Sequence, residues 1–371
     1  MSIDEGAMHW FRLRSRRSFM PRIGRLAEDQ DRRLAFGAAM QQFEEQMTAA
    51  KVVTAATRPI NLYYALVQAG LAITAAHADG KWRWKAHGLR PTNTAANLEG
   101  ICVKPDKADG AFQLVAQATG SSQISSPVSI GAIWASLPDI CDDAPLSESR
   151  APRALSLLDE TPLASVVTTS TPAGNGWASS NFKWTWKSPV PIALEAEPCA
   201  SFLVSQARLA DKKREVWLQE QMAHYPSAGG WAEPLSGDTF EEVDAWLLRV
   251  HLRWPLPDGP SLLTAPTVRA FFDKVAPEYR CQKQRYLRPS LEADRTPPPT
   301  PLMTWWLLLY SFSMLARYFP EQWVAMLDLD ESQYAVSLQY ACEAALTAIP
   351  HLVTEALDGG PLLLMQSAPL L

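Results

Sequence analysis

The stretch of residues 302–316 constrains the fold more than any other, because nearly every side chain in it is large and apolar. At 15 residues it is shorter than the roughly 20 apolar residues that a bilayer span needs. Thr304, Ser311 and Ser313 interrupt it, and Arg317 ends it. We therefore predict a helix that is buried on nearly all sides inside the protein, and no contact with a membrane.

Length and composition predict a large folded protein. With 371 residues, the chain exceeds the usual size of one compact domain, which favours two lobes or one domain with an insertion. Hydrophobic residues make up 47% and charged residues 20%, the composition of a globular protein. The net charge of −5 excludes an overall electrostatic attraction to nucleic acid or to an anionic membrane.

Neither a metal nor a cofactor is expected from the motifs present. The five cysteines are odd in number and contain no C-x-x-C pair, so neither a disulfide framework nor a zinc site is predicted. Phosphate-loop, metalloprotease, nucleophile-elbow and zinc-deaminase motifs are absent from the sequence. The first 20 residues carry a cluster of arginines where a secretory signal would carry an apolar stretch, which predicts a cytoplasmic location.

The two ends of the chain have helical patterns. Apolar residues recur at helical spacing over 28–53, and Pro59 suits the first turn of a second helix that reaches about residue 76. Near the other end, helices are predicted over 302–318 and 332–349, with Pro350 ending or kinking the second.

The middle of the chain has a different texture, with short apolar runs broken by Gly, Ser, Pro and Asn. Strands are predicted over 112–118, 128–134, 164–169 and 182–187, the last from strict alternation of aromatic and polar residues. Helical texture returns over 205–224, 240–253 and 265–275, and a proline-rich connector follows.

These patterns predict a mostly helical α+β protein. Its N- and C-terminal helices should pack together, with a β-containing region inserted between them. The predicted parts are an N-terminal helical part over 1–104, a β-containing part over 105–200, a helical region over 201–288 and C-terminal helices over 302–371, which complete the N-terminal helical lobe.

Three motifs carry a resemblance to a known family. They are Arg58-Pro59 followed by Tyr63-Tyr64, then His87-Gly88-Leu89, and finally Ser313 with Arg317-Tyr318, Pro320 and Trp323. The chain resembles the bacterial YaaC-like family, in particular its actinobacterial type. Ala86 departs from the glycine of many relatives, which puts a role for close backbone approach at that position in doubt. The resemblance implies no catalytic residues.

Arg317 has two interpretations. Trp306, Tyr310, Ser313 and Arg317 share one stripe of a helix, and the guanidinium at its end could hold a phosphate or a carboxylate. Alternatively, it bonds the last carbonyls of the helix or a buried acid such as Glu343, and so fixes how the terminal helices pack. We favour the structural interpretation.

His87 also has two interpretations. Because Arg83 and Lys85 precede it, it could be a general base with a lowered pKa, although a histidine beside a turn is more often structural. Helical ribonucleases of the HEPN type carry an arginine and a histidine with a longer spacer than the three residues between Arg83 and His87. A similar pair could instead be assembled in space, from Arg58 or Arg317 with His87.

Two charged clusters complete the candidates. Arginines near the N-terminus lie among aromatic residues and could bind RNA or an acidic partner, but a solvated face balanced by nearby acids is favoured; they are Arg12, Arg14, Arg16, Arg17, Arg22 and Arg25. Asp328, Asp330 and Glu331 could bind magnesium, although a role at the start of the next helix is favoured.

The sequence supports three functional hypotheses. The first is a non-catalytic or regulatory protein that works through a protein partner, in a setting of stress or phage defence that the family resemblance suggests. The second is a metal-independent ribonuclease of HEPN-like type that uses Arg58, His87 or Arg317. The third is nucleic-acid binding through the N-terminal arginines.

Overall fold

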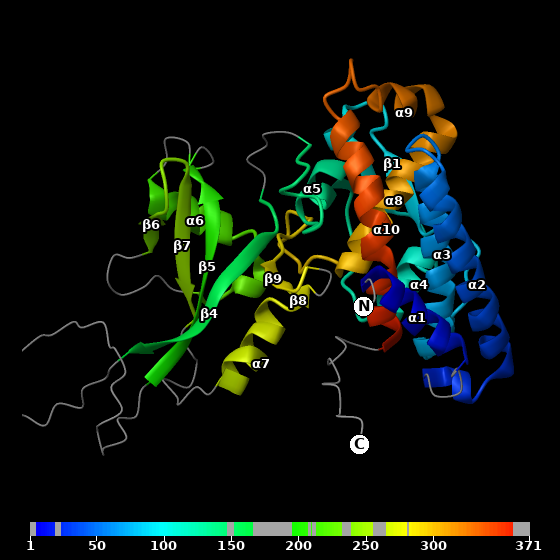
Figure 1. Cartoon of the computed structure of the whole chain (residues 1–371), viewed down its shortest axis with the longest axis horizontal. Coiled ribbons are helices and arrows are strands. Elements are labelled where there is room, and N and C mark those ends of the chain that lie inside the picture. Colours follow the sequence, from blue (N-terminus) through cyan, green and yellow to red (C-terminus); the bar gives the residue numbers. More distant parts are fainter. Residues whose placement is uncertain are drawn as a thin grey trace, which may run out of the picture.

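The computed structural model describes residues 5–18, 24–146, 152–165, 195–206, 209, 213–231, 239–254, 265–279 and 282–358. Within these ranges the protein is α+β and mostly helical, as predicted. Figure 1 shows a helical part on the right and a sheet part on the left. Each part has its own cluster of buried hydrophobic residues.

The helical part combines helices from both ends of the chain, which confirms the predicted packing. Its long helices are α1 (Glu5–Ser18), α2 (Gln30–Val52), α3 (Arg58–His77), α8 (Pro301–Tyr318) and α10 (Ala335–Asp358), with the short α9 (Pro320–Met326) at one end. Helix α3 contacts α2, α8 and α10, so it lies between the N-terminal and C-terminal elements.

A small sheet and two short helices also belong to the helical part. The sheet is antiparallel, with strands β1 (Leu89–Thr92), β2 (Cys102–Pro105) and β3 (Val128–Ser129). Helices α4 (Ala111–Ala118) and α5 (Ile130–Ala135) pack into the same core, and the short 3-10 helices η2 (Gly24–Ala27) and η3 (Leu98–Gly100) lie in connections of this part.

The sheet part is built on one six-stranded antiparallel sheet. Its strands, in spatial order, are β6 (Phe240–Glu242), β7 (Leu247–Arg253), β5 (Glu195–Ser205), β4 (Leu155–Ser165), β9 (Gln284–Leu287) and β8 (Glu278–Tyr279). The remaining elements are α6 (Arg214–Met222), α7 (Ala265–Val275) and the 3-10 helix η5 (Pro226–Ala228). Residues from both helices join the sheet in the second core.

Helix α8 is the buried helix that the apolar run predicts. Every residue from Leu302 to Ser313 is buried. The hydroxyls that interrupt the run bond backward within the helix, from Ser311 Oγ to Leu307 O at 2.9 Å and from Ser313 Oγ to Tyr310 O at 2.9 Å. Because their hydrogen bonds are satisfied inside the helix, these side chains cost little in an apolar core.

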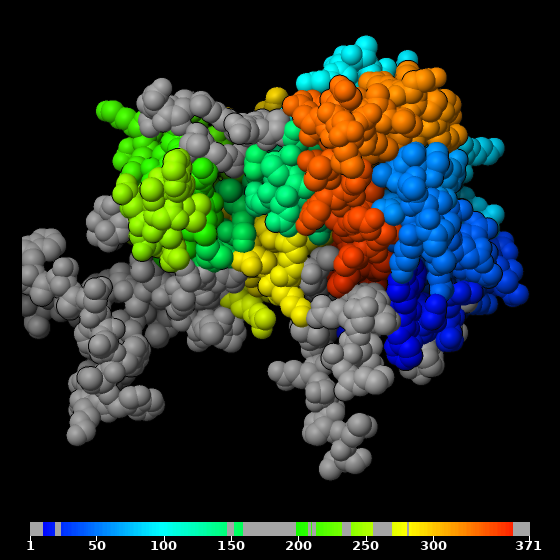
Figure 2. Space-filling model, turned by 45° about the horizontal axis from the view of Figure 1, so that its top comes forward, coloured from blue at the N-terminus to red at the C-terminus, as the bar shows by residue number. Residues whose placement is uncertain are grey.

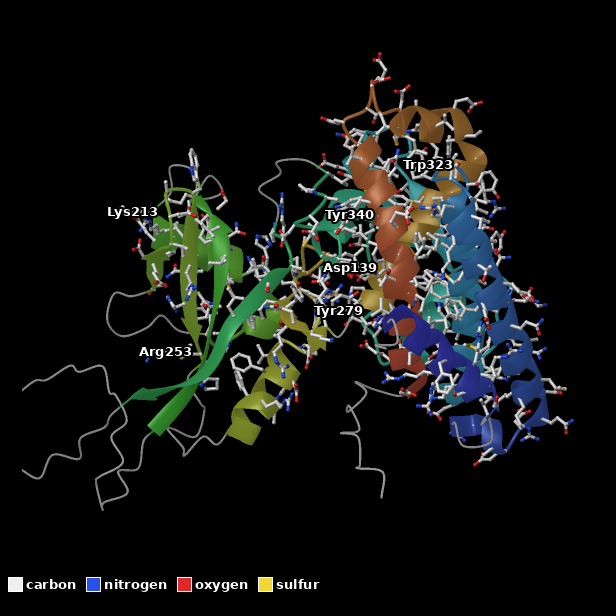
Figure 3. All side chains as sticks on the ribbon, viewed as in Figure 1. Asp139, Lys213, Arg253, Tyr279, Trp323 and Tyr340 are labelled. Atoms are coloured by element: carbon white, nitrogen blue, oxygen red, sulfur yellow. The ribbon has the colours of Figure 1, made fainter. Side chains whose placement is uncertain are left out.

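The two parts meet at a buried polar junction. The Asp139 carboxylate accepts hydrogen bonds from the Tyr279 hydroxyl at 2.6 Å and from the Trp305 indole nitrogen at 2.9 Å. Arg288 donates to Ser136 O at 3.0 Å and to Thr304 Oγ1 at 2.6 Å. Burial raises the pKa of Asp139 and lowers the pKa of Arg288 to about 10. Figure 3 shows Asp139 and Tyr279 close together between the two parts.

Two predicted strands are wrong. Residues 112–118 form helix α4, and 128–134 form only the two residues of β3 before helix α5 begins. The first six residues of α4 are all buried, Gln113 included, and the helix has only eight residues, which is too short for its period to decide between helix and strand. A short apolar run of this kind cannot be assigned to strand or helix from periodicity alone.

The predicted helix over 240–253 is also wrong. It forms strands β6 and β7, and β7 alternates buried Leu248, Val250 and Leu252 with less buried Arg249 and His251. This period of two is the pattern of a strand with one covered face. The predicted helical region over 201–288 therefore contains strands as well as helices. Within the described part of the predicted helix over 205–224, α6 is the α-helix that the structure contains.

The other predicted elements have mixed outcomes. The helices over 28–53, 58–76 and 265–275 are confirmed as α2, α3 and α7. Pro350 does not end α10, which continues to Asp358 because its packing outweighs the local cost of a proline, about 3 kcal/mol. Strand β4 covers the start of 164–169, and 182–187 lies outside the described residues. The boundaries of the four predicted parts stay a prediction.

Candidate functional site

Residues of all three family motifs meet at one place in the helical part. Tyr63 comes from α3, His87 from the loop before β1, and Arg317 from α8, on which Tyr310 lies two turns earlier. The ring centroids of Tyr63 and His87 are 5.5 Å apart, those of His87 and Tyr310 are 6.0 Å apart, and those of Tyr63 and Tyr310 are 5.5 Å apart. We call these three residues, with Tyr64, Arg317 and Tyr318, the aromatic site.

The loop that carries His87 is held by the start of α4. The backbone N–H groups of Ala111 and Phe112 donate to Ala86 O at 2.9 Å and to His87 O at 3.1 Å. These bonds satisfy N–H groups that have no partner inside the helix. The chain does approach another segment at Ala86, but it does so through the Ala86 carbonyl oxygen. Because every residue has this oxygen, a glycine is not needed there.

Gly88 is the position in this loop that requires glycine. Its φ is +79°, and a Cβ atom there would lie 1.9 Å from Gln113 Oε1 and 3.0 Å from Gly110 Cα. Gln113 also donates to Gly88 O at 2.8 Å. The glycine thus combines a left-handed backbone with a close approach of two chain segments.

His87 is half-buried and bonded to Tyr63, with 2.8 Å between its Nδ1 atom and the Tyr63 hydroxyl. Burial, and secondarily the charge of Arg317, lowers the pKa of His87 from 6.5, so the ring is neutral at pH 7. Burial raises the pKa of Tyr63, which therefore keeps its proton and can donate it to Nδ1. With that bond, the ring proton of His87 is on Nε2, which then donates and cannot act as a base.

Tyr310 has a structural role in the aromatic site. Its hydroxyl donates to Leu89 O at 2.8 Å, which ties α8 to strand β1. Burial raises its pKa as well, so it stays protonated near neutral pH. Trp306 packs edge-on against Tyr63, with 6.2 Å between their ring centroids.

Arg317 lies at the edge of the aromatic site. Its guanidinium carbon is 5.8 Å from the centroid of the Tyr64 ring and 5.0 Å from that of Tyr318, and Nη2 is 3.2 Å from the Tyr318 hydroxyl. Among the described residues, no carboxylate forms an ion pair with it. The predicted alternative of a bond from Arg317 to Glu343 is therefore wrong, because Glu343 pairs with Arg58.

Arg58 is a structural residue outside the aromatic site. It donates from Nε to Ala50 O and from Nη2 to Val53 O, each at 2.9 Å, and it pairs with Glu343 on α10. It therefore fastens the α2–α3 turn to α10. The structure brings Arg317, and not Arg58, to His87.

The other motif residues are also structural. Pro59 and Pro320 occupy the first turns of α3 and α9, and Leu89 is buried at the start of β1. The indole nitrogen of Trp323 donates to Ala55 O at 3.2 Å and to Ala56 O at 3.1 Å, which joins α9 to the α2–α3 turn. Trp323 is labelled at this end of the helical part in Figure 3.

The two charged clusters have different surroundings in the described residues. Several N-terminal arginines pair with acids, in the pairs Arg14–Glu44, Arg16–Asp358 and Arg25–Asp79. Arg22 lies outside the described residues. Helix α10 begins at Ala335, so Asp328, Asp330 and Glu331 precede it without entering its first turn. Within the described ranges, no group of three His, Cys, Asp or Glu side chains is placed to hold a metal ion.

The sequence prediction missed a set of exposed apolar side chains. Six of the thirteen exposed large hydrophobic side chains in the described ranges lie between residues 318 and 340. They are Tyr318, Phe319, Val324, Leu329, Val336 and Tyr340. We call this set the α9 surface. No local pattern separates these apolar residues from those of the buried helix beside them, so only the structure shows that they are exposed.

The family model described as YaaC-like Protein matches residues 24–357. The chain therefore belongs to the YaaC-like family, as the three motifs indicate. No curated protein and no solved structure matches it. None of the helices in the described ranges has the length and apolar character that a bilayer span needs.

Arg317→Gln should raise the pKa of His87, because the charge of Arg317 disfavours the protonated ring. The value should stay below 6.5, since burial is the larger cause. A pH titration of the histidine ring signals by NMR measures the change. His224, whose pKa is lowered by burial and by Arg295, is the internal control and should not shift. An unchanged His87 would show that Arg317 is too far away to act on it.

Gly88→Ala should lower the free energy of unfolding by about 2 to 4 kcal/mol, because it adds backbone strain and a clash. Gly120→Ala is the matched control, since Gly120 has φ +62° but no atom within 4 Å of an added Cβ. It should cost about 1 kcal/mol. Urea unfolding of both variants tests the difference, and equal losses would contradict the close approach at Gly88.

Proposed function

We propose that this protein is a non-catalytic interaction protein that binds a protein partner through the α9 surface. The observation that carries the proposal is the concentration of exposed apolar side chains between residues 318 and 340. Scattered apolar side chains are normal on protein surfaces, whereas a concentration of them marks an interaction site. A cytoplasmic location and a setting of stress or phage defence belong to the same proposal.

The α9 surface follows the chain from the end of α8 through α9 to the start of α10. Tyr318 and Phe319 end α8, Val324 lies on the outward side of α9, and Leu329 follows in the turn. Val336 and Tyr340 are one helical turn apart on α10. Figure 2 shows the end of α8, α9 and the start of α10, in orange, near one another at one end of the helical part.

The backbone beneath the α9 surface is well supported. Trp323 lies on the inner side of α9 and is fully buried. Its ring centroid is 5.2 Å from that of Phe312 on α8. Gln322 donates to Thr94 O at 3.2 Å, which ties α9 to the loop after β1. A rigid apolar surface loses little conformational entropy on binding, which favours affinity. Each exposed side chain that a partner buries can contribute roughly 1.5 to 3 kcal/mol.

Val324→Glu should abolish binding to the partner, because it places a charge in the middle of an apolar interface. Val216→Glu is the matched control, since Val216 is similarly exposed on α6 in the sheet part. The measurement is purification of each tagged protein from the native host, with quantification of the proteins that accompany it. A stoichiometric partner should accompany the wild type and the control, and fall at least about tenfold with Val324→Glu. Equal recovery from all three would refute the role of this surface.

A metal-independent ribonuclease is the second candidate, and the proximity of His87 and Arg317 favours it. Arg317 could bind a phosphate while a neutral His87 accepted a proton from a ribose hydroxyl. The hydrogen bond from Tyr63 opposes this function when it leaves the proton on Nε2. This bond would have to be exchanged before His87 could act as a base.

RNA cleavage by the purified chain tests the second candidate. The ribonuclease function requires that His87→Ala and Arg317→Ala lose at least about 100-fold in rate, the lower range for a general base. His224→Ala, which changes a histidine in the other part, should keep full activity. We expect no cleavage above background with any of the four proteins. If the wild type and His224→Ala cleave RNA and only His87→Ala and Arg317→Ala do not, the ribonuclease function replaces the interaction proposal.

A further inference from the structure

Opposite charges flank the part of the α9 surface that the end of α8 and α9 contribute. At one end Arg317 precedes Tyr318 and Phe319. At the other end Asp328, Asp330 and Glu331 are exposed around Leu329. Val324 lies between these ends on the outward side of α9. A ligand that covers the apolar residues must therefore pass close to both charged ends.

The basic end is well prepared to bind an oxyanion. The guanidinium of Arg317 lies against the Tyr64 and Tyr318 rings, which limits its motion. Its nearest acid along the chain is Glu321, in the first turn of α9, and the two form no ion pair within the described residues. A planar guanidinium held in this way can bind a carboxylate with two parallel hydrogen bonds.

The acidic end lacks a cationic partner within the described residues. The Asp328 carboxylate accepts a hydrogen bond from Asp330 N at 2.9 Å, which shapes the turn but leaves the negative charges in solvent. No ion pair involves Asp328, Asp330 or Glu331 in that part of the chain. This end therefore favours a lysine or an arginine in whatever covers Leu329.

We infer that the α9 surface binds a segment of the partner protein in which apolar residues are flanked by an acidic residue at one end and a basic residue at the other. The inference rests on the proposed function and specifies its partner. The acidic side chain binds Arg317, and the basic side chain lies against the turn at residues 328–331. The opposite charges fix the direction in which the segment runs.

The length of α9 sets the spacing within this segment. Seven helical residues are about 10 Å long, which is the length that a bound segment must cover along α9. An extended segment covers it with about three or four residues, and a helical segment with about seven. The acidic and basic residues should therefore be separated by a few residues, and the residues between them should be apolar.

Selection of a displayed library of random 12-residue peptides against the full chain tests the inference. Enriched peptides should combine an acidic residue, an apolar stretch and a basic residue in one constant direction. Synthetic copies of the enriched peptides should bind the Arg317→Gln variant about fivefold more weakly than the wild type, because one partly exposed ion pair is lost. Arg83→Gln is the matched control, because Arg83 also stacks on an aromatic ring, Trp82, but lies outside the α9 surface.

The outcomes separate this inference from the proposed function. Some peptides could lose binding to the Val324→Glu variant and yet lack the charge pattern or bind Arg317→Gln normally. Such peptides would overturn the inference but not the proposed function. If every enriched peptide binds the Val324→Glu variant as well as the wild type, both the inference and the proposed function fail. A second copy of the chain could also occupy the α9 surface, and sedimentation of the purified chain tests this. A dimer that dissociates in the Val324→Glu variant would show that a second copy binds there. Enriched peptides that carry the charge pattern would support the inference. A charge reversal would then establish it: a peptide with lysine in place of its acidic residue should bind the Arg317→Glu variant.

Discussion

The burial of helix α8 is the constraint on which the rest of the structure depends. A helix that is apolar on all sides must be covered on all sides, and α3, α5, α9 and α10 all contact it. Gly70 on α3 allows a close approach to α8, since a Cβ there would lie 2.6 Å from the Trp306 ring. In its first turns α8 also holds the junction to the sheet part, through Thr304 and Trp305. Both parts of the protein are thus organised around one helix.

The same constraint explains why the family motifs meet. Tyr63 packs on Trp306 and Tyr310 because α3 lies against α8, and His87 reaches them because α4 fixes its loop. Where α8 leaves the core, Arg317 and the aromatic residues after it come to the surface together. The motifs therefore combine a buried structural half with an exposed half, and only the exposed half is available to a partner.

Much of the helical part could be predicted from the sequence, because local signals suffice for it. The apolar run of α8 and the proline at the start of α3 define helices without any tertiary information. The strands of residues 240–253 were missed although Leu248, Val250 and Leu252 alternate with charged residues, a signal that is present but short. The aromatic site could be predicted only as a set of separate residues. The partners of Arg58 and Arg317 depend on the packing of distant helices, which no local pattern encodes.

We propose that this protein binds its partner at the α9 surface. A photo-crosslinking amino acid at position 324 in the native host tests this, with the same residue at position 216 as the reference. We expect one abundant crosslinked protein from position 324 and none of it from position 216. The same products from both positions, or crosslinks to RNA in place of protein, would contradict it.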